Sequence, residues 1–346
     1  MASKVSATEL RRFITDICMH EGMTAADAGT MADTLVWANL RGVDTHGVMR
    51  LPRYLEMIEQ GIMNVGAKPT YSSPKPSSVV IDADRAPGPV VMSQAVERLK
   101  RLAKDHGIAM ALIGEMTHTG ALGYYTSNLA EAGLASLAFN AGGPFMPYHG
   151  ARGVALGTNP ISIAVPGGDS HPLVLDMASS TVAMGKLVMA RKTGTPLEPG
   201  WAIDEAGNPT TDPAKAVLST PLGGPKGSGL SLMVEILGNI LSGNPLIADV
   251  LQKTGVKHRQ SALLIAIDIA TFIDPAEFGS QVQRLVGALK ALPLAADAVS
   301  ILMPGERGYL AMIERSATGI PVPPPVLAEL GTVAERFGIK PLAMLP

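Results

Sequence analysis

The sequence is poor in cysteine and has no marked excess of either charge. Cys18 is its only cysteine, so no internal disulfide can form, and its place on an apolar helical stripe favours a buried structural thiol over a nucleophile. The 28 Lys and Arg nearly balance the 30 Asp and Glu, which leaves no basic surface for nucleic acid or for an anionic membrane. We therefore expect a small-molecule partner, with no nucleic acid and no membrane involved.

Long hydrophobic runs are also missing. The longest one, residues 262–273, is interrupted by Asp268 and is too short to span a bilayer. The N-terminal residues lead into an amphipathic helix without the apolar segment of a secretion signal. These features predict a soluble protein in the cytoplasm. A chain of 346 residues is longer than one core usually supports, so two compact units are expected.

Several common motifs are absent as well. No Gly-x-Gly-x-x-Gly occurs, so the glycine fingerprint of a Rossmann fold is missing. Gly185-Lys186 resembles the end of a phosphate-binding P-loop, but position 180 is Ser180, and Leu187 stands where Ser or Thr should bind magnesium. The His-Glu-x-x-His and Gly-x-Ser-x-Gly spacings are missing too, and we expect no metal site.

The N-terminal part of the chain is predicted to be helical. Ser6 and Glu9 form a capping box, and apolar residues at helical spacing follow as far as Gly22. A second helix is expected to run from Thr24 to about residue 42. Residues 45–61 are also expected to be mainly helical, with Pro52 kinking or restarting the helix.

A different pattern begins after a loop-like stretch at residues 63–78, which is the best candidate for a crossing between domains. Strands and helices alternate from there, which predicts an α/β fold. The helix expected at residues 326–337 can return to pack beside the N-terminal helices. The strands are expected at residues 79–82, 108–113, 134–139, 161–165, 173–176 and 262–267, and the helices at 89–106, 119–132, 182–191, 229–241 and 275–292.

Polar groups are crowded into residues 41–54. If this stretch is helical, His46, Arg50 and Tyr54 are four residues apart and share one face. Asp44 lies two residues from His46, where a carboxylate can orient an imidazole, and an arginine fork matches a substrate carboxylate. A helix-entry turn with an Asp cap and a surface histidine explains the same residues equally well.

Four further segments are candidates for binding or catalysis. His118 follows an expected strand, where α/β sheets often place reactive groups, although a lone histidine there is more often structural. One group comprises residues 157–160 and 176–180 with Lys186, and another comprises residues 221–229 with Lys226. Both offer backbone N–H groups and a cation to an anion. Ordinary helix caps or a mobile surface loop are the alternatives. Residues 304–308 read more simply as a turn.

Taken together, these segments resemble the malate/L-lactate dehydrogenase family, which is distinct from the Rossmann dehydrogenases and includes ureidoglycolate and sulfolactate dehydrogenases, diketogulonate reductase and piperideine-2-carboxylate reductase. The match covers nearly the whole chain. It is carried by Arg41-Gly42-Val43-Asp44-Thr45-His46-Gly47, Arg50, Leu51-Pro52-Arg53-Tyr54, His118, Gly120, Gly123-Tyr124, Gly157-Thr158-Asn159-Pro160, Leu175-Asp176-Met177-Ala178, Gly185-Lys186, Gly200-Trp201, Pro209-Thr210-Thr211-Asp212, Gly223-Gly224, Lys226-Gly227 and Pro304-Gly305-Glu306.

The resemblance implies an oxidoreductase that passes a hydride between NAD(P)H and a 2-oxo or 2-hydroxy acid. Its alternatives are a cyclic-imine acid reductase and a dinucleotide-binding protein without catalysis. The fold implied is α/β: a non-Rossmann NAD(P)-binding domain with a mixed, largely antiparallel sheet at residues 77–302, plus a helical, substrate-side domain from residues 1–76 and 303–346. Family members are usually homodimers with the active site between domains, and their cofactor is NAD or NADP.

Roles for individual residues also follow from the resemblance. His46, or else His118, transfers the proton, Arg50 pairs with the substrate carboxylate, Asp44 orients His46, and Tyr54 adds a hydrogen bond. Relatives often have Gly-His where this chain has Ser261-Ala262, so a histidine contact there is lost. The residues expected at the cofactor are Ala141, Gly142, Asp176, Met177, Ala178, Lys226, Gly227, Pro304, Gly305 and Glu306.

Overall fold

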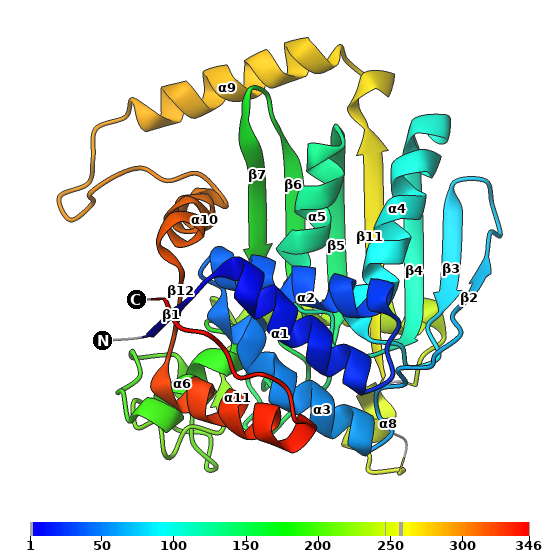
Figure 1. Cartoon of the computed structure of the whole chain (residues 1–346). Helices are drawn as coiled ribbons and strands as arrows, with labels where there is room; N and C mark the ends of the chain where they lie inside the picture. Colours follow the sequence, from blue (N-terminus) through cyan, green and yellow to red (C-terminus); the bar gives the residue numbers. More distant parts are fainter. Residues whose placement is uncertain (1–2, 246, 256–258, 346) are drawn as a thin grey trace.

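A seven-stranded sheet forms the centre of the computed structural model, which describes residues 3–245, 247–255 and 259–345 (Figure 1). Only the β3–β4 pair is parallel; the other neighbouring strands are antiparallel. The predicted mixed, largely antiparallel sheet is thereby confirmed. In spatial order the strands are β2 (Thr70–Ser72), β3 (Ser78–Asp82), β4 (Ile108–Met116), β11 (Gln260–Asp268), β5 (Leu134–Ala141), β6 (Ile161–Gly167) and β7 (Ser170–Met177).

Helices α4 (Gly88–His106) and α5 (Leu122–Glu131) pack on one face of this sheet (Figure 1). Both supply apolar residues at helical spacing to the same core as β3, β4, β5 and β11. The helix predicted at residues 119–132 begins three residues late, at Leu122, because Gly120 has a positive φ of 76° and the N-cap Ala121 is extended, which turns the chain after His118.

A second core unites the two ends of the chain. Helices α1 (Ala7–His20), α2 (Ala25–Leu40) and α3 (Leu51–Glu59) share it with α11 (Pro324–Phe337). Strands β1 (Ser3–Val5) and β12 (Ile320–Val322) pair next to them. The C-terminal helix therefore returns to the N-terminal helices, as expected (Figure 1). The division at residues 76/77 and 302/303 stays a prediction.

Several elements differ from those expected. Residues 304–308, which read as a turn, begin helix α10 (Glu306–Thr318), whose N-cap Gly305 has a left-handed backbone. The helix expected at residues 229–241 begins earlier, as α7 (Pro225–Glu235), because Pro225 fits a first helical turn, and it continues as the π-helix η3 (Ile236–Ile240). Helix α6 (Met184–Thr193), the short α8 (Ile247–Leu251) and a small sheet of β8 (Ala202–Ile203), β9 (Pro209–Thr210) and β10 (Leu218–Ser219) complete the fold.

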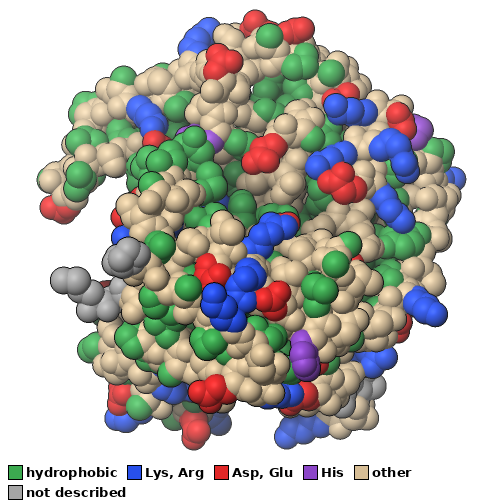
Figure 2. All heavy atoms as spheres, in the orientation of Figure 1, with side chains coloured by type: hydrophobic (Ala, Val, Ile, Leu, Met, Phe, Trp, Pro, Cys, Tyr) green, Lys and Arg blue, Asp and Glu red, His purple; other side chains and the backbone are tan. Residues whose placement is uncertain are grey.

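Helix α9 (Pro275–Lys290) and the segment after it form an arm at the edge of the molecule (Figure 1). Gly279 is the one buried residue of this helix. Leu285 is 61% exposed, Leu292 55% and Val299 95%, so the arm presents apolar side chains to its surroundings. In Figure 2 it overhangs one side of the molecule. A search of the described helices finds none with the length and apolar character that a membrane span requires.

Candidate active site

Residues 44–50 form a compact turn between α2 and α3. Two short 3-10 segments, η1 (Asp44–His46) and η2 (Val48–Arg50), are followed directly by α3, with Pro52 in its first turn. Of the two expected effects of Pro52, the helix restarts there rather than kinking. Asn39 accepts a hydrogen bond from the Val48 N–H at 2.8 Å, and a Cβ at Gly47 would lie 2.2 Å from the same oxygen. The side chain of Asn39 thus fixes the turn.

His46 lies at the centre of a cluster of polar side chains. Its Nδ1 is 3.0 Å from the Thr45 hydroxyl, and its ring stacks on that of His118 with 5.6 Å between centroids. Loss of hydration lowers the pKa of His46 to about 3, and the nearby Arg50 charge acts in the same direction. In the absence of a bound anion, this histidine is neutral.

Tyr54 connects His118 to the same cluster. The Tyr54 hydroxyl is 2.8 Å from Nδ1 of His118, and the backbone N–H of Gly120 donates to the same nitrogen at 3.1 Å. Burial lowers the pKa of His118 well below its ordinary value, and the Arg50 charge and His46 lower it further. Residues 64 positions apart in the sequence are therefore joined at one point.

Arg50 carries the positive charge of the cluster. Its Nε donates to the Thr45 carbonyl at 2.6 Å, which fixes the start of the guanidinium group. A Cβ on Gly185 would lie 3.6 Å from Nη2, so the arginine also lies against α6. No carboxylate of the described residues forms an ion pair with Arg50. Its charge is available to an anion from solution.

Asp44 does not orient His46, so that expectation was wrong. Its carboxylate accepts hydrogen bonds from Arg315 at 2.8 and 3.1 Å and from the Asn39 amide at 2.7 Å. Residues two apart in a 3-10 turn point to different sides, which directs Asp44 away from the imidazole. The neighbouring Thr45 holds His46 instead. The position of Thr45 next to His46 in the sequence could have predicted this contact. Nothing in the sequence connected Asp44 to Arg315, which is 271 positions away.

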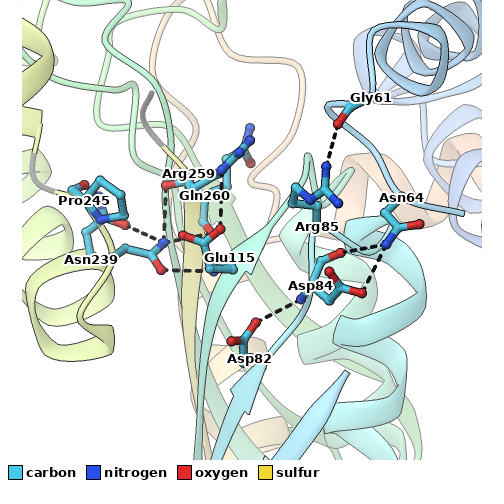
Figure 3. Close-up of polar contacts among 11 residues, drawn as sticks. Gly61, Asn64, Asp82, Asp84, Arg85, Glu115, Asn239, Pro245, Arg259 and Gln260 are labelled. Carbon is cyan, nitrogen blue, oxygen red and sulfur yellow. Dashed lines mark hydrogen bonds and ion pairs between the residues drawn. The ribbon is translucent and has the colours of Figure 1, made fainter. Parts of the chain in front are cut away.

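The turn that leads to His118 is held mainly through its backbone. Asp84, Arg85 and Glu115 all have positive φ values, of 48°, 60° and 52°, which are strained for residues with a side chain. The Arg85 N–H donates to the Glu115 carbonyl at 2.7 Å. This hydrogen bond connects the strained residues Asp84 and Arg85 to the strained Glu115. Figure 3 shows the side chains around them: Asn64 contacts Asp84, and Arg259 contacts Glu115.

Gly88, the first residue of α4, packs against the backbone of Thr117 and His118. A Cβ at this position would lie 2.4 Å from the His118 carbonyl oxygen and 2.7 Å from that of Thr117. The Gly88 N–H also donates to the Thr117 hydroxyl at 3.2 Å, and that hydroxyl donates to the Ala86 carbonyl at 2.9 Å. Only glycine fits at the start of α4 while His118 keeps its place. Sequence reasoning did not single out Gly88.

Two of the expected cofactor segments contact the elements next to the two histidines, one beside the His46 turn and one after His118. Arg41, which begins the turn, donates to the Gly305 carbonyl at 2.8 Å. Asp176 accepts a hydrogen bond from the Gly123 N–H at 2.7 Å, at the N-terminus of the helix that follows His118. Burial raises the pKa of Asp176 to about 6, against the opposing effects of that hydrogen bond and of Arg41.

The other cofactor segments continue from Asp176 as a connected series. The Ser179 N–H donates to the Thr158 carbonyl at 2.9 Å, and the Gly142 N–H donates to the Asn159 side chain at 2.9 Å. A Cβ on Gly227 would lie 2.3 Å from the Ser179 carbonyl oxygen. The structure therefore gathers residues 141–142, 176–178 and 226–227, which are scattered along the sequence.

This series has groups that suit an anionic dinucleotide. The Ser179 hydroxyl is buried and has no hydrogen-bond partner among the described residues. Lys226 is exposed, lies at the start of α7, and forms no ion pair with a described carboxylate. An unpartnered donor and a free cation near a helix N-terminus fit a diphosphate group. By contrast, the Glu306 carboxylate is already paired with Lys290 and the Met303 N–H.

Ser261 and Ala262, which stand where relatives often have Gly-His, lie inside the sheet on β11. Ser261 pairs with Ala141 across β11 and β5, and its hydroxyl donates to the Asn239 side chain at 2.8 Å. Both Ser261 and Ala262 are fully buried. These two side chains are enclosed by the protein, although their neighbour Ala141 belongs to the expected cofactor set.

Comparison with known proteins agrees with this architecture. The model of the malate/L-lactate dehydrogenase family matches residues 5–331. A malate dehydrogenase from Pyrococcus horikoshii is 35% identical, with 98% of this chain and 97% of that protein covered. A Δ1-pyrroline-2-carboxylate reductase from Ancylobacter novellus is 31% identical, covering 96% and 98% of the two chains. The crystal structure of malate dehydrogenase from Entamoeba histolytica superimposes with a TM-score of 0.92 at 26% identity, covering 98% and 99%.

The chain therefore belongs to the malate/L-lactate dehydrogenase family, as its motifs indicated. It is an oxidoreductase of the malate/lactate dehydrogenase type, a family that acts on hydroxy acids and uses a nicotinamide cofactor. The absence of the Rossmann glycine fingerprint agrees with the sheet, which is largely antiparallel: its one parallel pair gives a single βαβ unit, β3–α4–β4, in place of the parallel series that carries that motif.

Proposed function

We propose that the protein interconverts a 2-oxo acid and the matching 2-hydroxy acid, with NADH or NADPH as the hydride donor. The observation that carries this proposal is the meeting of His46, His118, Arg50 and Tyr54 at one junction, beside the segments gathered around Asp176. An anion-binding arginine and an imidazole are what reduction of a carbonyl next to a carboxylate requires.

Each side chain has a separate task in this proposal. Arg50 binds the substrate carboxylate, for which its fork geometry and free charge are suited. An imidazole supplies the proton to the substrate oxygen, and Tyr54 holds His118 through its hydroxyl. The carboxylate on Arg50 would offset the charge that lowers the pKa of His46, so substrate binding favours the protonated ring.

The cofactor would be held by the connected series of segments. Lys226 and the Ser179 hydroxyl would bind its diphosphate, and Gly142, where a Cβ would meet nothing within 4 Å, leaves room for close approach. Gly227 packs closely on the Ser179 carbonyl and would keep Lys226 beside that residue. Residues Ala141, Met177, Ala178, Pro304, Gly305 and Glu306 would complete its surroundings. When bound, the nicotinamide supplies or accepts the hydride.

The test is a panel of 2-oxo acids and cyclic imine acids, each assayed with NADH and with NADPH. We expect oxidation of one cofactor with at least one 2-oxo acid, and loss of it in Arg50→Gln through a raised KM. A protein that binds NADH or NADPH, measured by nucleotide fluorescence, but oxidises neither with any substrate would contradict the proposal. That result would favour a dinucleotide-binding protein without catalysis.

A second candidate is reduction of a cyclic imine acid, which the Ancylobacter novellus relative favours by its name and its 31% identity. The same arginine would bind the ring carboxylate, and the proton would go to nitrogen instead of oxygen. Turnover of Δ1-pyrroline-2-carboxylate that exceeds turnover of every 2-oxo acid in the panel would establish this alternative.

We also infer a homodimer, as the family resemblance implies. The apolar side chains of the arm are the surface that a second copy fits, since Leu285, Leu289 and Leu292 follow one stripe of exposed positions. Light scattering should give twice the chain mass for the wild type and a single chain for Leu285→Glu/Leu292→Glu. A wild-type monomer would contradict the inference, as would a double variant that stays dimeric.

A further inference from the structure

The two histidines of the site have hydrogen-bond partners of different kinds. Nδ1 of His46 faces a hydroxyl, that of Thr45, at 3.0 Å. Nδ1 of His118 faces the Tyr54 hydroxyl at 2.8 Å and the backbone N–H of Gly120 at 3.1 Å. A hydroxyl can donate or accept, whereas a backbone N–H can only donate. This difference fixes which protonation states each ring can adopt.

The Gly120 amide determines the tautomer of His118. Because the amide donates to Nδ1, that nitrogen must carry a lone pair, and the proton of the neutral ring must lie on Nε2. Protonating the ring fully would place an N–H on Nδ1, facing the N–H of Gly120. It would break this hydrogen bond and turn the Tyr54 hydroxyl round.

His46 has no such restriction. The Thr45 hydroxyl can donate to Nδ1 when the ring is neutral and accept from it when the ring is protonated. The charged and titratable groups near His46 are Arg50 on η2, Tyr54 on α3 and His118 after β4, while Asp44 is paired with Arg315 of α10. A bound carboxylate would neutralise Arg50, the one unpaired charge among them.

We propose that His118 stays neutral throughout the reaction and donates a hydrogen bond from Nε2 to the substrate oxygen, while His46 exchanges the proton. This inference rests on the proposed function. During reduction, a bound nicotinamide would supply the hydride, with its electron pair, to C2. An N–H bond of the His46 imidazolium breaks, an O–H bond forms on the substrate, and His46 is left neutral. Oxidation of the hydroxy acid is the reverse.

The first test reads the tautomer in the wild-type protein. The imidazole nitrogens of protein labelled with 15N-histidine report by NMR which nitrogen carries the proton, and loss of one signal set in His118→Gln and of another in His46→Gln assigns them. We expect His118 to keep a proton on Nε2 alone between about pH 6 and pH 9. A proton on its Nδ1, or a doubly protonated ring, would overturn the proposal.

The second test separates a hydrogen-bond donor from a proton carrier. A Gln side chain can donate from nearly the position of Nε2 but does not titrate. His118→Gln should therefore keep about tenfold more turnover than His118→Ala, with the pH profile of the wild type. His46→Gln should lose about a hundredfold or more and lose the pH dependence of kcat/KM as well. The opposite pattern, with the pH dependence lost in His118→Gln, would overturn the proposal.

The controls distinguish this proposal from the proposed function. His106→Gln changes an exposed histidine at the end of α4 and should match the wild type in turnover and thermal stability. Circular dichroism of every variant verifies that it is folded. If the wild type reduces no compound in the panel, the proposed function fails. The NMR measurement still tests whether His118 keeps its proton on Nε2, because that part of the inference does not depend on activity.

Discussion

The turn that carries His46 and the turn that carries His118 are held in place by different means. Side chains from distant segments hold the first: Asn39 binds Val48, and Arg315 binds Asp44. Backbone geometry holds the second, through the positive φ of Glu115 and the close contact of Gly88. Hydrogen bonds between side chains can lengthen gradually when one partner changes. The backbone around His118, in contrast, is in tight van der Waals contact with Gly88, so any added atom there must displace it. The two turns should therefore respond differently to substitution.

Gly88→Ala should have the largest effect, because it attacks the backbone-held turn. The new Cβ would lie 2.4 Å from the His118 carbonyl oxygen, so the turn must shift. A displacement of about 1 Å in a catalytic group costs about a hundredfold in turnover. Steady-state kinetics with the best substrate of the panel measures the loss.

Gly331→Ala is the matched control. It lies in α11, where a Cβ meets nothing within 4 Å and alanine favours the helix, so turnover should stay at the wild-type level. If Gly88→Ala kept wild-type turnover while folded, the His118 turn would not be fixed by its backbone, and the contrast between the two turns would disappear.

The sequence predicted the sheet and most helices because their signals are local. Alternating and helical spacing of apolar residues, together with Pro and Gly at the ends, located β3 to β7, β11, α4 and α9 within a few residues. Helix α10 was missed because Pro304 and Gly305 directly before Glu306 made its start look like a turn.

The site was predictable only where its parts are adjacent in the chain. The spacing of His46, Arg50 and Tyr54 was visible, whereas the partner of Asp44 was not, because Arg315 is brought to it by the return of the C-terminal segment. Gly88 has no chemistry of its own, so only the position of His118 reveals its role. The cofactor segments came from the resemblance and not from local spacing.

Asp176→Asn tests the helix that follows the His118 turn. Burial raises the pKa of Asp176 to about 6 from an ordinary 3.8, so the folded protein favours the protonated acid. The stability that this group contributes is present below about pH 4 and is lost as the pH rises through 6. The neutral amide keeps the acceptor for Gly123 and should stabilise the protein by about 3 kcal/mol at pH 8, or about 4 °C in Tm.

Thermal melts of wild type and Asp176→Asn at intervals from pH 4 to pH 8 provide the measurement. The two Tm values should coincide near pH 4 and separate as the pH rises. A constant difference across this range would show that the pKa of Asp176 is the same in the folded and unfolded protein, and would contradict the prediction. Asp274→Asn, an exposed N-cap on the arm, is the matched control, and its Tm should stay close to that of the wild type because Asn caps a helix as well as Asp does.

Arg315→Gln removes the ion pair with Asp44 that holds the turn carrying His46. Asp44 would lose its bidentate partner, but Asn39 would still hold both Asp44 and Val48. We expect about a tenfold loss in kcat/KM and about 1 kcal/mol of stability, since the pair is partly exposed. Arg336→Gln removes a more exposed pair with Glu59 and should change neither quantity measurably. A loss as severe as that of Gly88→Ala would show that both turns are equally rigid.

Tyr54→Phe should have the smallest effect, and it sharpens the comparison most directly. It removes one of the two donors to Nδ1 of His118 and leaves the Gly120 amide, so the tautomer and the ring position should persist. We expect a loss of about threefold to tenfold in kcat, the usual scale of one neutral hydrogen bond, with the 15N signals of His118 unchanged in tautomer. If the proton moved to Nδ1 in this variant, the side chain of Tyr54 and not the backbone would control His118, and the two turns would be held by the same means.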